Sequence, residues 1–293
     1  MRRTIIIVCL LCVHVLVNAQ SVPSLLLPGD ASSTVAPTVL MNVDRAFESN
    51  PAAAVFAPGR FGAWAGGAAW APKTAGTTII AGGASARFGD KIAVAVSYRS
   101  LADKPYEIVS ASGSVTGTFT PADKIISLGS SFKIGSSLGA GLMLRYLTSA
   151  IGTDLKGSTF CADLSLFYSK EALSAGLSVR NLGGKISWGD DAYALPLNAS
   201  LGAAYSVAGL KAGLEVNYLF EGAFGAGVGA EYLIADIATV RAGYHLGDKS
   251  KGLTSYVSLG LGAKFAGVCL DAAYLLASET LGGSLVAGLS YSF

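Results

Sequence analysis

The sequence from Leu210 to Leu246 reads LKAGLEVNYLFEGAFGAGVGAEYLIADIATVRAGYHL. Apolar residues alternate in it with small or polar residues, in three runs separated by short turns. A helix would place apolar residues at positions i, i+3 and i+4 and would mix the two sets, whereas a strand turns alternate side chains to opposite faces. The stretch therefore predicts three strands, each with one apolar face and one small or polar face, as in transmembrane β-barrels.

The composition of the whole chain agrees with a membrane β-barrel. Of its 293 residues, 52% are hydrophobic and 14% are charged, whereas soluble domains average about 25% charged residues. The mean hydropathy is +0.52, yet after residue 19 no run approaches the ~18 apolar residues of a spanning helix. These values argue against a soluble enzyme, a helical membrane protein and a disordered chain, and leave an unusually apolar soluble β-protein as the alternative to a barrel.

Alternation of this kind recurs in fourteen segments from residue 60 onward. Bacterial single-chain barrels have an even number of strands, because both termini lie on the periplasmic side. The long joins, 101–122 and 182–194, follow odd-numbered segments, and the joins after even-numbered ones are short, as expected if the long loops lie outside the cell. We predict an all-β fold, a transmembrane antiparallel β-barrel of about 14 strands with an N-terminal plug-like segment. The predicted strands are 60–71, 75–88, 91–100, 123–134, 137–148, 157–169, 171–181, 195–207, 209–220, 223–235, 238–247, 252–266, 267–276 and 282–293.

The first nineteen residues have the features of a secretory signal peptide. Arg2 and Arg3 form a charged start, an apolar stretch follows over 4–15, and residues 17–19 offer a small-residue cleavage site. A lipoprotein anchor at Cys12 is the alternative, which the large residue before that cysteine disfavours. The chain has 21 basic and 19 acidic residues, and cleavage would leave 19 of each. A neutral mature chain gives no reason to expect a nucleic-acid partner.

Residues 20–59 lack the alternation of the strands. Five of the nine prolines lie in this segment, and proline is disfavoured inside strands. The apolar triplets at 25–27 and 39–41 argue against a disordered leader, because such groups are unfavourable in water. We therefore predict that this segment folds into the lumen as a plug or hatch. The predicted domains are the signal peptide 1–19, the plug 20–59 and the barrel 60–293.

Tyrosines mark the expected rims of the barrel. Nine of the twelve fall on the apolar face near the C-terminal end of a predicted strand. The tyrosine ring favours this depth because it lies in the apolar region while its hydroxyl reaches water, so we predict an anchoring girdle. The last strand ends at Phe293 and is expected to close the barrel and remove its free edge. The nine tyrosines are Tyr98, Tyr146, Tyr168, Tyr205, Tyr218, Tyr232, Tyr244, Tyr274 and Tyr291.

Charged residues on the inward face predict a polar network in the lumen. We expect ion pairs that hold the interior and the plug in place, and the alternative is a mildly cationic pore that favours anionic solutes. Small inward residues such as Gly225, Gly227 and Gly229 are expected to leave room in the lumen. The candidate lumenal polar network is Arg99, Arg145, Arg180, Glu215, Glu231, Arg241 and His245.

The sequence offers no catalytic centre, cofactor site or metal site. Glu215 and Glu231 lie on adjacent strands, but no nucleophile or suitable histidine accompanies this pair of carboxylates. After cleavage His245 is the one remaining histidine, which excludes a zinc site built on several histidines. Cys161 and Cys269 are far apart in sequence and form neither a CxxC motif nor a disulfide framework. We therefore expect a protein that is not an enzyme and needs no cofactor.

Short motifs resemble those of the PorV/PorQ family of outer-membrane barrels, which are related in fold to the FadL long-chain fatty acid transporters. LLLPGDA at 25–31 precedes NPAA at 50–53, and SVRNLGGKI at 178–186 is similar to a mid-barrel phrase of the family. The resemblance spans nearly the whole mature chain. It implies a place in the bacterial outer membrane and an accessory role in type IX protein secretion or surface attachment, with other outer-membrane or secreted surface proteins as partners.

The main functional prediction is therefore a partner-binding barrel surrounded by outer-membrane lipid. Its candidate partner-binding loop carries the apolar residues Tyr106, Ile108 and Val109. The alternative is a FadL-like transporter of small hydrophobic molecules, which needs an apolar pocket in the lumen. A diffusion porin fits the barrel but not the segment before it, and side chains can largely fill a lumen of fourteen strands. The apolar candidates on the inward face are Ile79, Met143, Phe167 and Leu219.

Overall fold

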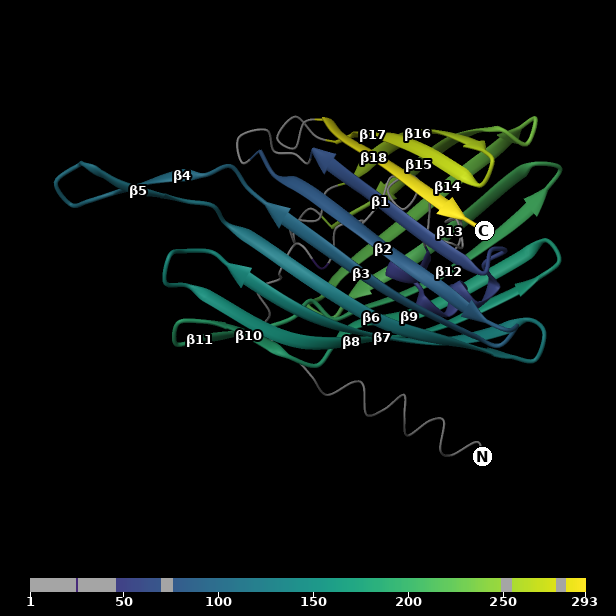
Figure 1. Ribbon diagram of the computed structural model, residues 1–293, viewed down its shortest axis with the longest axis horizontal. Coiled ribbons are helices and arrows are strands. Elements are labelled where there is room, and N and C mark those ends of the chain that lie inside the picture. Colours follow the sequence, from purple (N-terminus) through teal and green to yellow (C-terminus); the bar gives the residue numbers. More distant parts are fainter. Residues whose placement is uncertain (1–24, 26–45, 70–75, 249–254, 278–282) are drawn as a thin grey trace, which may run out of the picture.

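Fourteen antiparallel strands close a barrel in the computed structural model (Figure 1). The structure describes residue 25 and residues 46–69, 76–248, 255–277 and 283–293. Each barrel strand pairs with the next one along the chain, and β1 pairs with β18 to complete the ring. The predicted fold class and strand number are confirmed. The barrel strands are β1 (Phe61–Ala69), β2 (Thr78–Phe88), β3 (Ile92–Ala102), β6 (Ala122–Ile134), β7 (Leu138–Ala150), β8 (Lys156–Lys170), β9 (Leu173–Leu182), β12 (Asn198–Val207), β13 (Leu210–Leu219), β14 (Ala223–Ile234), β15 (Ala238–Leu246), β16 (Tyr256–Phe265), β17 (Val268–Leu276) and β18 (Gly283–Ser292).

The two ends of the barrel differ in their connections. At the turn end, on the right in Figure 1, two or three residues join consecutive strands. At the loop end, two hairpins lie within the joins predicted as loops: β4 (Tyr106–Val109) with β5 (Val115–Phe119), and β10 (Lys185–Trp188) with β11 (Asp191–Ala194). Sequence reasoning missed these four strands because each is only four or five residues long, too short for a clear alternation.

Alternate residues of each strand face the lumen and the outside, as the alternation predicts. In β7, Leu144 and Tyr146 are exposed, whereas Met143, Arg145 and Leu147 between and beside them are buried. The exposed set is apolar because it meets lipid, and the buried set includes charges because it meets the protein interior. The barrel thus inverts the usual arrangement of a soluble protein, with its polar groups inside.

Two tight turns explain the unusual backbone angles of four residues. Ala208 and Gly209 connect β12 to β13 with φ of 45° and 81°, and Ala266 and Gly267 connect β16 to β17 with φ of 47° and 81°. Two-residue hairpin turns matched to the twist of the strands need a positive φ at both positions. Glycine adopts this conformation without strain, and alanine tolerates it at one position of each turn.

The last strand closes the barrel at its turn end. The backbone N–H of Phe61 donates to the carbonyl of Phe293 over 2.9 Å, and the N–H of Phe293 donates to Phe61 over 3.0 Å. Their rings lie 5.4 Å apart. Of the nine tyrosines predicted to face outward, eight are exposed and Tyr168 is partly buried. Closure of the sheet satisfies the edge hydrogen bonds that lipid cannot.

Among the described residues, no helix is long and apolar enough to cross a membrane. The predicted signal peptide, residues 1–19, lies outside the described residues, as do residues 20–24 and 26–45 of the predicted plug. The described remainder of that plug consists of Leu25 and the residues from 46 onward. The division into signal peptide, plug and barrel stays a prediction.

Replacing Leu144 by Arg tests whether the exposed face of β7 lies at the membrane midplane. Leu144 lies at the middle of β7 and is 52% exposed, so an arginine there would be held at the membrane midplane. We expect the free energy of unfolding into lipid vesicles to fall by about 2–4 kcal/mol. The same change at Ile134, an exposed residue at the turn end, should cost at most about 1 kcal/mol. Equal effects at the two positions would contradict the assignment.

Candidate functional site in the barrel lumen

Two short 3₁₀-helices lie against the inner face of the barrel wall. They are η4 (Ala46–Glu48) and η5 (Pro51–Phe56), and η5 contacts β2, β3, β6, β7 and β8. The backbone N–H of Ala52 donates to the hydroxyl of Ser165 over 2.9 Å, and the side-chain amide of Asn50 donates to the carbonyl of Leu166 over 3.2 Å. Proline starts η5 at a position where its missing N–H costs nothing. We call residues 46–56 the inner segment.

Glycines in the wall let the inner segment approach closely. A Cβ atom at Gly141 would lie 2.3 Å from the nitrogen of Ala52, and one at Gly139 would lie 2.6 Å from its carbonyl oxygen. At Gly129 a Cβ would meet the ring of Phe47 at 2.3 Å. These distances are far below van der Waals contact, so the wall must carry glycine where the inner segment rests on it.

On the opposite wall, two of the inward glycines that the sequence analysis singled out are covered by side chains of neighbouring strands. A Cβ at Gly225 would lie 2.3 Å from the side chain of Asn217, and one at Gly227 would lie 3.3 Å from His245. In each case a long side chain from the neighbouring strand lies across the glycine. The small residues thus accommodate large lumenal side chains of adjacent strands.

A buried ion-pair network fastens the inner segment to the wall. The carboxylate of Glu48 lies 2.8 Å from Arg99 and 3.6 Å from Arg145, and it also accepts a hydrogen bond from the hydroxyl of Ser97. Arg145 in turn pairs with Asp163 at 2.7 Å and donates to the backbone carbonyl of Glu48 at 2.8 Å. All five residues are buried. We call Glu48, Arg99, Arg145 and Asp163 the lumenal latch.

The surroundings of Glu48 keep its carboxyl ionised. Burial alone would raise its pKa, but the charges of Arg99 and Arg145, with hydrogen bonds from Ser97 and Arg99, outweigh burial and hold the pKa below its ordinary value of 4.5. A carboxyl with a lowered pKa stabilises the folded state above its unfolded pKa, and this stabilisation is lost as the pH falls through the folded value. The latch is therefore fully formed at neutral pH.

Asp163 also fixes an irregularity in the wall. The register between β8 and β9 shifts between Ala162 and Leu164, the two residues on either side of it. The second carboxylate oxygen of Asp163 accepts a hydrogen bond from the backbone N–H of Asn181 over 2.8 Å, and Asn181 has a φ of 63°. The side-chain amide of Asn181 donates to the carbonyl of Pro196. One carboxylate thus connects the latch to the base of the β10–β11 hairpin.

A second charged cluster lies on β13, β14, β15 and β17, away from the five strands that η5 contacts most. Arg241 donates to Glu231 over 3.0 Å and also to Asp271. Lys211 pairs in register with Glu231, so charges of alternating sign follow one another across the wall. These four side chains line a cavity of about 580 Å³ at the turn end. Within the described part of the chain, no cluster of three or more metal-ligating side chains suitable for a metal ion is found.

The seven residues of the predicted polar network lie on six strands of the barrel: β3, β7, β9, β13, β14 and β15. Arg99 and Arg145 meet at Glu48, and Glu231 and Arg241 form a separate pair. Arg180 donates to Asn198 over 3.4 Å, and His245 stacks on the ring of Tyr256 at 4.5 Å. Glu215 is buried in the wall on β13, two strands from His245. Sequence reasoning missed Glu48, because that residue lies outside the alternating pattern on which the predicted network was built.

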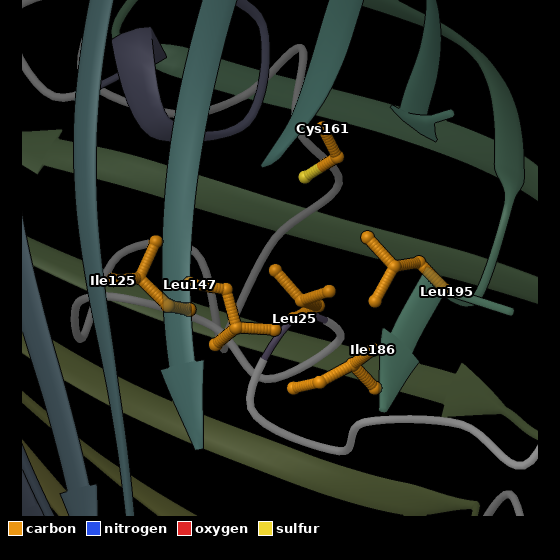
Figure 2. Packing of buried hydrophobic residues seen from close by; sticks show 6 residues of the cluster. All are labelled: Leu25, Ile125, Leu147, Cys161, Ile186 and Leu195. Atoms are coloured by element: carbon orange, nitrogen blue, oxygen red, sulfur yellow. The ribbon is translucent and has the colours of Figure 1, made fainter. Parts of the chain in front are cut away.

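An apolar pocket near the loop end encloses Leu25 (Figure 2). The pocket joins side chains from β6, β7 and β8 to the β10–β11 hairpin, and Trp188 and Tyr193 pack against it. Leu25 is 5% exposed and is contributed by the segment that precedes the barrel. Its neighbours in the pocket are Ile125, Leu147, Cys161, Ile186 and Leu195. We call these five residues the Leu25 pocket.

The four apolar candidates of the sequence analysis lie apart from this pocket. Ile79 belongs to a second apolar cluster on β1, β2, β17 and β18, against which Leu101 and Tyr256 pack. Met143 packs with Phe47 and other residues of the inner segment, and the rings of Phe167 and Phe56 lie 5.6 Å apart. Leu219 is buried but belongs to none of these clusters. They are all inward, as predicted, but they do not line one pocket.

Hairpin β4–β5 carries the predicted partner-binding residues. Tyr106 and Val109 are exposed, and Ile108 is partly buried. The ring of Tyr106 contacts that of Phe119 on the partner strand at 5.5 Å. The hairpin extends beyond the barrel at the loop end (Figure 1). The structure places these side chains on a projecting hairpin, and their binding role stays a prediction.

No protein-family model matches the chain, and no curated protein matches it in sequence. The fold is similar to that of three solved structures, among others. In each of these three comparisons, the alignment covers 90% of this chain and 97% of the other chain. They are the toluene transporter TbuX of Ralstonia pickettii (13% identity, TM-score 0.59), the toluene transporter TodX of Pseudomonas putida (15%, 0.60) and a FadL homologue of Pseudomonas aeruginosa (14%, 0.61). The chain therefore has the fold of a FadL-type barrel. The PorV/PorQ membership that the motifs imply is not confirmed by any match.

Replacing Glu48 by Gln tests the lumenal latch. Breaking a buried ion pair on one side costs about 3–5 kcal/mol, because the remaining charges are left without their counter-charge. We expect the inner segment to detach at neutral pH and the variant to conduct ions in planar bilayers more than the wild type does. The wild type should gain conductance only as the pH falls below the lowered pKa of Glu48, whereas the variant should not respond to pH in that range.

The matched control for this substitution is Glu107→Gln, which removes an exposed carboxylate from β4. It should leave conductance and its pH dependence unchanged. A Glu48→Gln barrel as closed as the wild type would show that the latch does not hold the inner segment.

Proposed function

We propose that this protein is a passive channel for small hydrophobic molecules in a bacterial outer membrane. Three observations support the proposal: the FadL-type fold, apolar clusters in the lumen near the loop end, and an inner segment held against one wall of the lumen. Two of the similar structures are named as toluene transporters, TbuX and TodX. A passive channel also agrees with the expectation of a protein that is not an enzyme.

The Leu25 pocket carries the proposal. The side chain of Leu25 is a branched hydrocarbon that packs among apolar neighbours inside the barrel. Burying a leucine side chain is worth about 1.5–3 kcal/mol, and a small hydrocarbon gains a comparable free energy when it leaves water for the same surroundings. The pocket is therefore suited to hydrocarbon ligands of similar size.

The arrangement of the lumen suggests how such a ligand would pass through the barrel. The ligand leaves water at the loop end, where the β10–β11 hairpin supplies Ile186 and Trp188 beside the barrel wall. Below the pocket, the latch and the inner segment narrow the route, since they occupy the faces of β6, β7 and β8. Passage follows the concentration gradient and requires the inner segment to shift. The latch sets the free energy of that shift.

Partner binding is the second candidate function, and the exposed apolar hairpin β4–β5 favours it. Tyr106 and Val109 project into solvent at the loop end, where a secreted or surface protein would meet them. Exposed apolar groups of this kind often mark protein contacts. The likeness in fold to hydrocarbon transporters supports the channel better than this accessory role.

Uptake of radiolabelled toluene by intact cells tests the proposed function. Cells that make the protein should accumulate toluene several-fold faster than cells that lack it. Replacing Ile186 by Asp should abolish this gain, because a carboxylate in the Leu25 pocket is costly to desolvate and repels a hydrocarbon. Ile186 lies in a hairpin outside the barrel sheet, so the variant barrel should still fold, which surface labelling would verify.

Val109→Asp is the matched control, because it places the same charge on the other hairpin, where Val109 is exposed. It should leave toluene uptake unchanged. Equal uptake with and without the wild-type protein would refute the channel. A surface protein that co-purifies with the wild type and is lost from the Val109→Asp variant would favour partner binding.

A further inference from the structure

The outer face of β3, β6, β7 and β8 changes from apolar to polar between two neighbouring rows of residues near the loop end. One row of outward residues, paired strand to strand, is apolar or aromatic: Tyr98, Ile126, Tyr146 and Phe160. The next row toward the loop end is polar: Ser100, Lys124, Thr148 and Ser158. Outward apolar residues meet acyl chains and polar ones meet headgroups. The step between the two rows therefore marks the level at which lipid headgroups begin.

Two lysines lie at this level. Lys124 stands in the polar row, and Lys156 lies one row further out, in register with Ala150. Both are exposed. Among the residues that the structure describes, neither ammonium group forms an ion pair. Two positive charges are thus available on one side of the rim.

A groove of about 560 Å³ lies between these lysines. It is many times larger than the ~30 Å³ that one water molecule occupies in the liquid. Lys124, Tyr146 and Ser158 are outward-facing, so the groove opens on the membrane-facing surface and not on the lumen. Its polar lining consists of Thr120, Lys124, Tyr146, Thr148, Ser149, Lys156 and Ser158.

This set of side chains suits a phosphate group. Ammonium groups give charge-assisted hydrogen bonds to phosphate oxygens, and hydroxyl groups add neutral ones. Lysines at a membrane surface attract anionic lipids, and their long stems lie along apolar surface while the charge reaches the interface. Directly below, the rings of Tyr146 and Phe160 lie 4.7 Å apart. They form an apolar platform on which the chains of the same lipid can lie.

We propose that the groove between Lys124 and Lys156 binds the phosphate of an anionic lipid of the outer leaflet. The proposal rests on the outer-membrane placement, with the loop end outside, but not on hydrocarbon transport, because the groove is on the opposite face of the wall from the Leu25 pocket. A lipid held there fixes the depth of β6, β7 and β8, the strands that carry the inner segment.

Binding of lipid A, a phosphorylated glycolipid, to the full-length protein in detergent micelles tests the site by native mass spectrometry. The double variant Lys124→Gln, Lys156→Gln should bind lipid A about fivefold or more weakly, since each lysine contributes to the attraction. Lys124→Arg with Lys156→Arg should restore binding. The control Lys91→Gln, Lys170→Gln removes two exposed lysines from the turn end and should bind as the wild type does.

Two further measurements distinguish the phosphate of a lipid from free inorganic phosphate. Lipid A stripped of its phosphates should bind the wild type and the Gln variant equally weakly, and inorganic phosphate at millimolar concentration should not displace the intact lipid. Unchanged lipid A binding in the Lys124, Lys156 variant would overturn the proposal, as would displacement by inorganic phosphate. Toluene uptake by the same variant should match the wild type, so a failure of this site would not be mistaken for a failure of the channel.

Discussion

The buried carboxylate of Glu48 is the interaction on which the arrangement of the lumen depends. It joins the inner segment to Arg99 on β3 and Arg145 on β7, and Arg145 continues the contact to Asp163 on β8. Buried charges are stable only when they are paired and hydrogen-bonded. Glu48 therefore stabilises the two buried arginines, and the arginines in turn hold the inner segment in place. Without Glu48, both guanidinium groups would lose a carboxylate partner.

The latch separates two apolar regions of the same wall. On its turn-end side, Met143 packs with the inner segment, which rests on the wall at Gly129, Gly139 and Gly141. On its loop-end side, Leu147 contributes to the pocket that holds Leu25. Along β7 the order is thus apolar, charged, apolar within five residues. A hydrophobic molecule in the Leu25 pocket would meet the latch next, so the strength of one ion-pair network would set how readily the route below it opens.

The sequence was sufficient to predict the barrel but not the assembly inside it. Alternation at period two, as in Leu210–Leu219, specifies a strand and its two faces, and fourteen such runs with short turns specify a closed sheet. The pattern does not specify which inward charges form ion pairs. Those pairs depend on the reach of the side chains and on residues 20–59, which lack the alternation. Arg99 and Arg145 were predicted to face the lumen, but their partner Glu48 lies in a 3₁₀-helix. Leu25 likewise packs with residues that lie 100 or more positions later in the chain, which no local pattern around Leu25 could indicate.

Hydrogen exchange of the wild-type protein in lipid nanodiscs at neutral pH tests most directly whether the inner segment is held in the lumen. The amide of Ala52, bonded to Ser165, and that of Ala53, bonded to the carbonyl of Asn50, are the reporters. Both amides should exchange orders of magnitude more slowly than in an unstructured peptide, and faster when toluene is added. Exchange at the unstructured rate without ligand, while β6 to β8 stay protected, would contradict it.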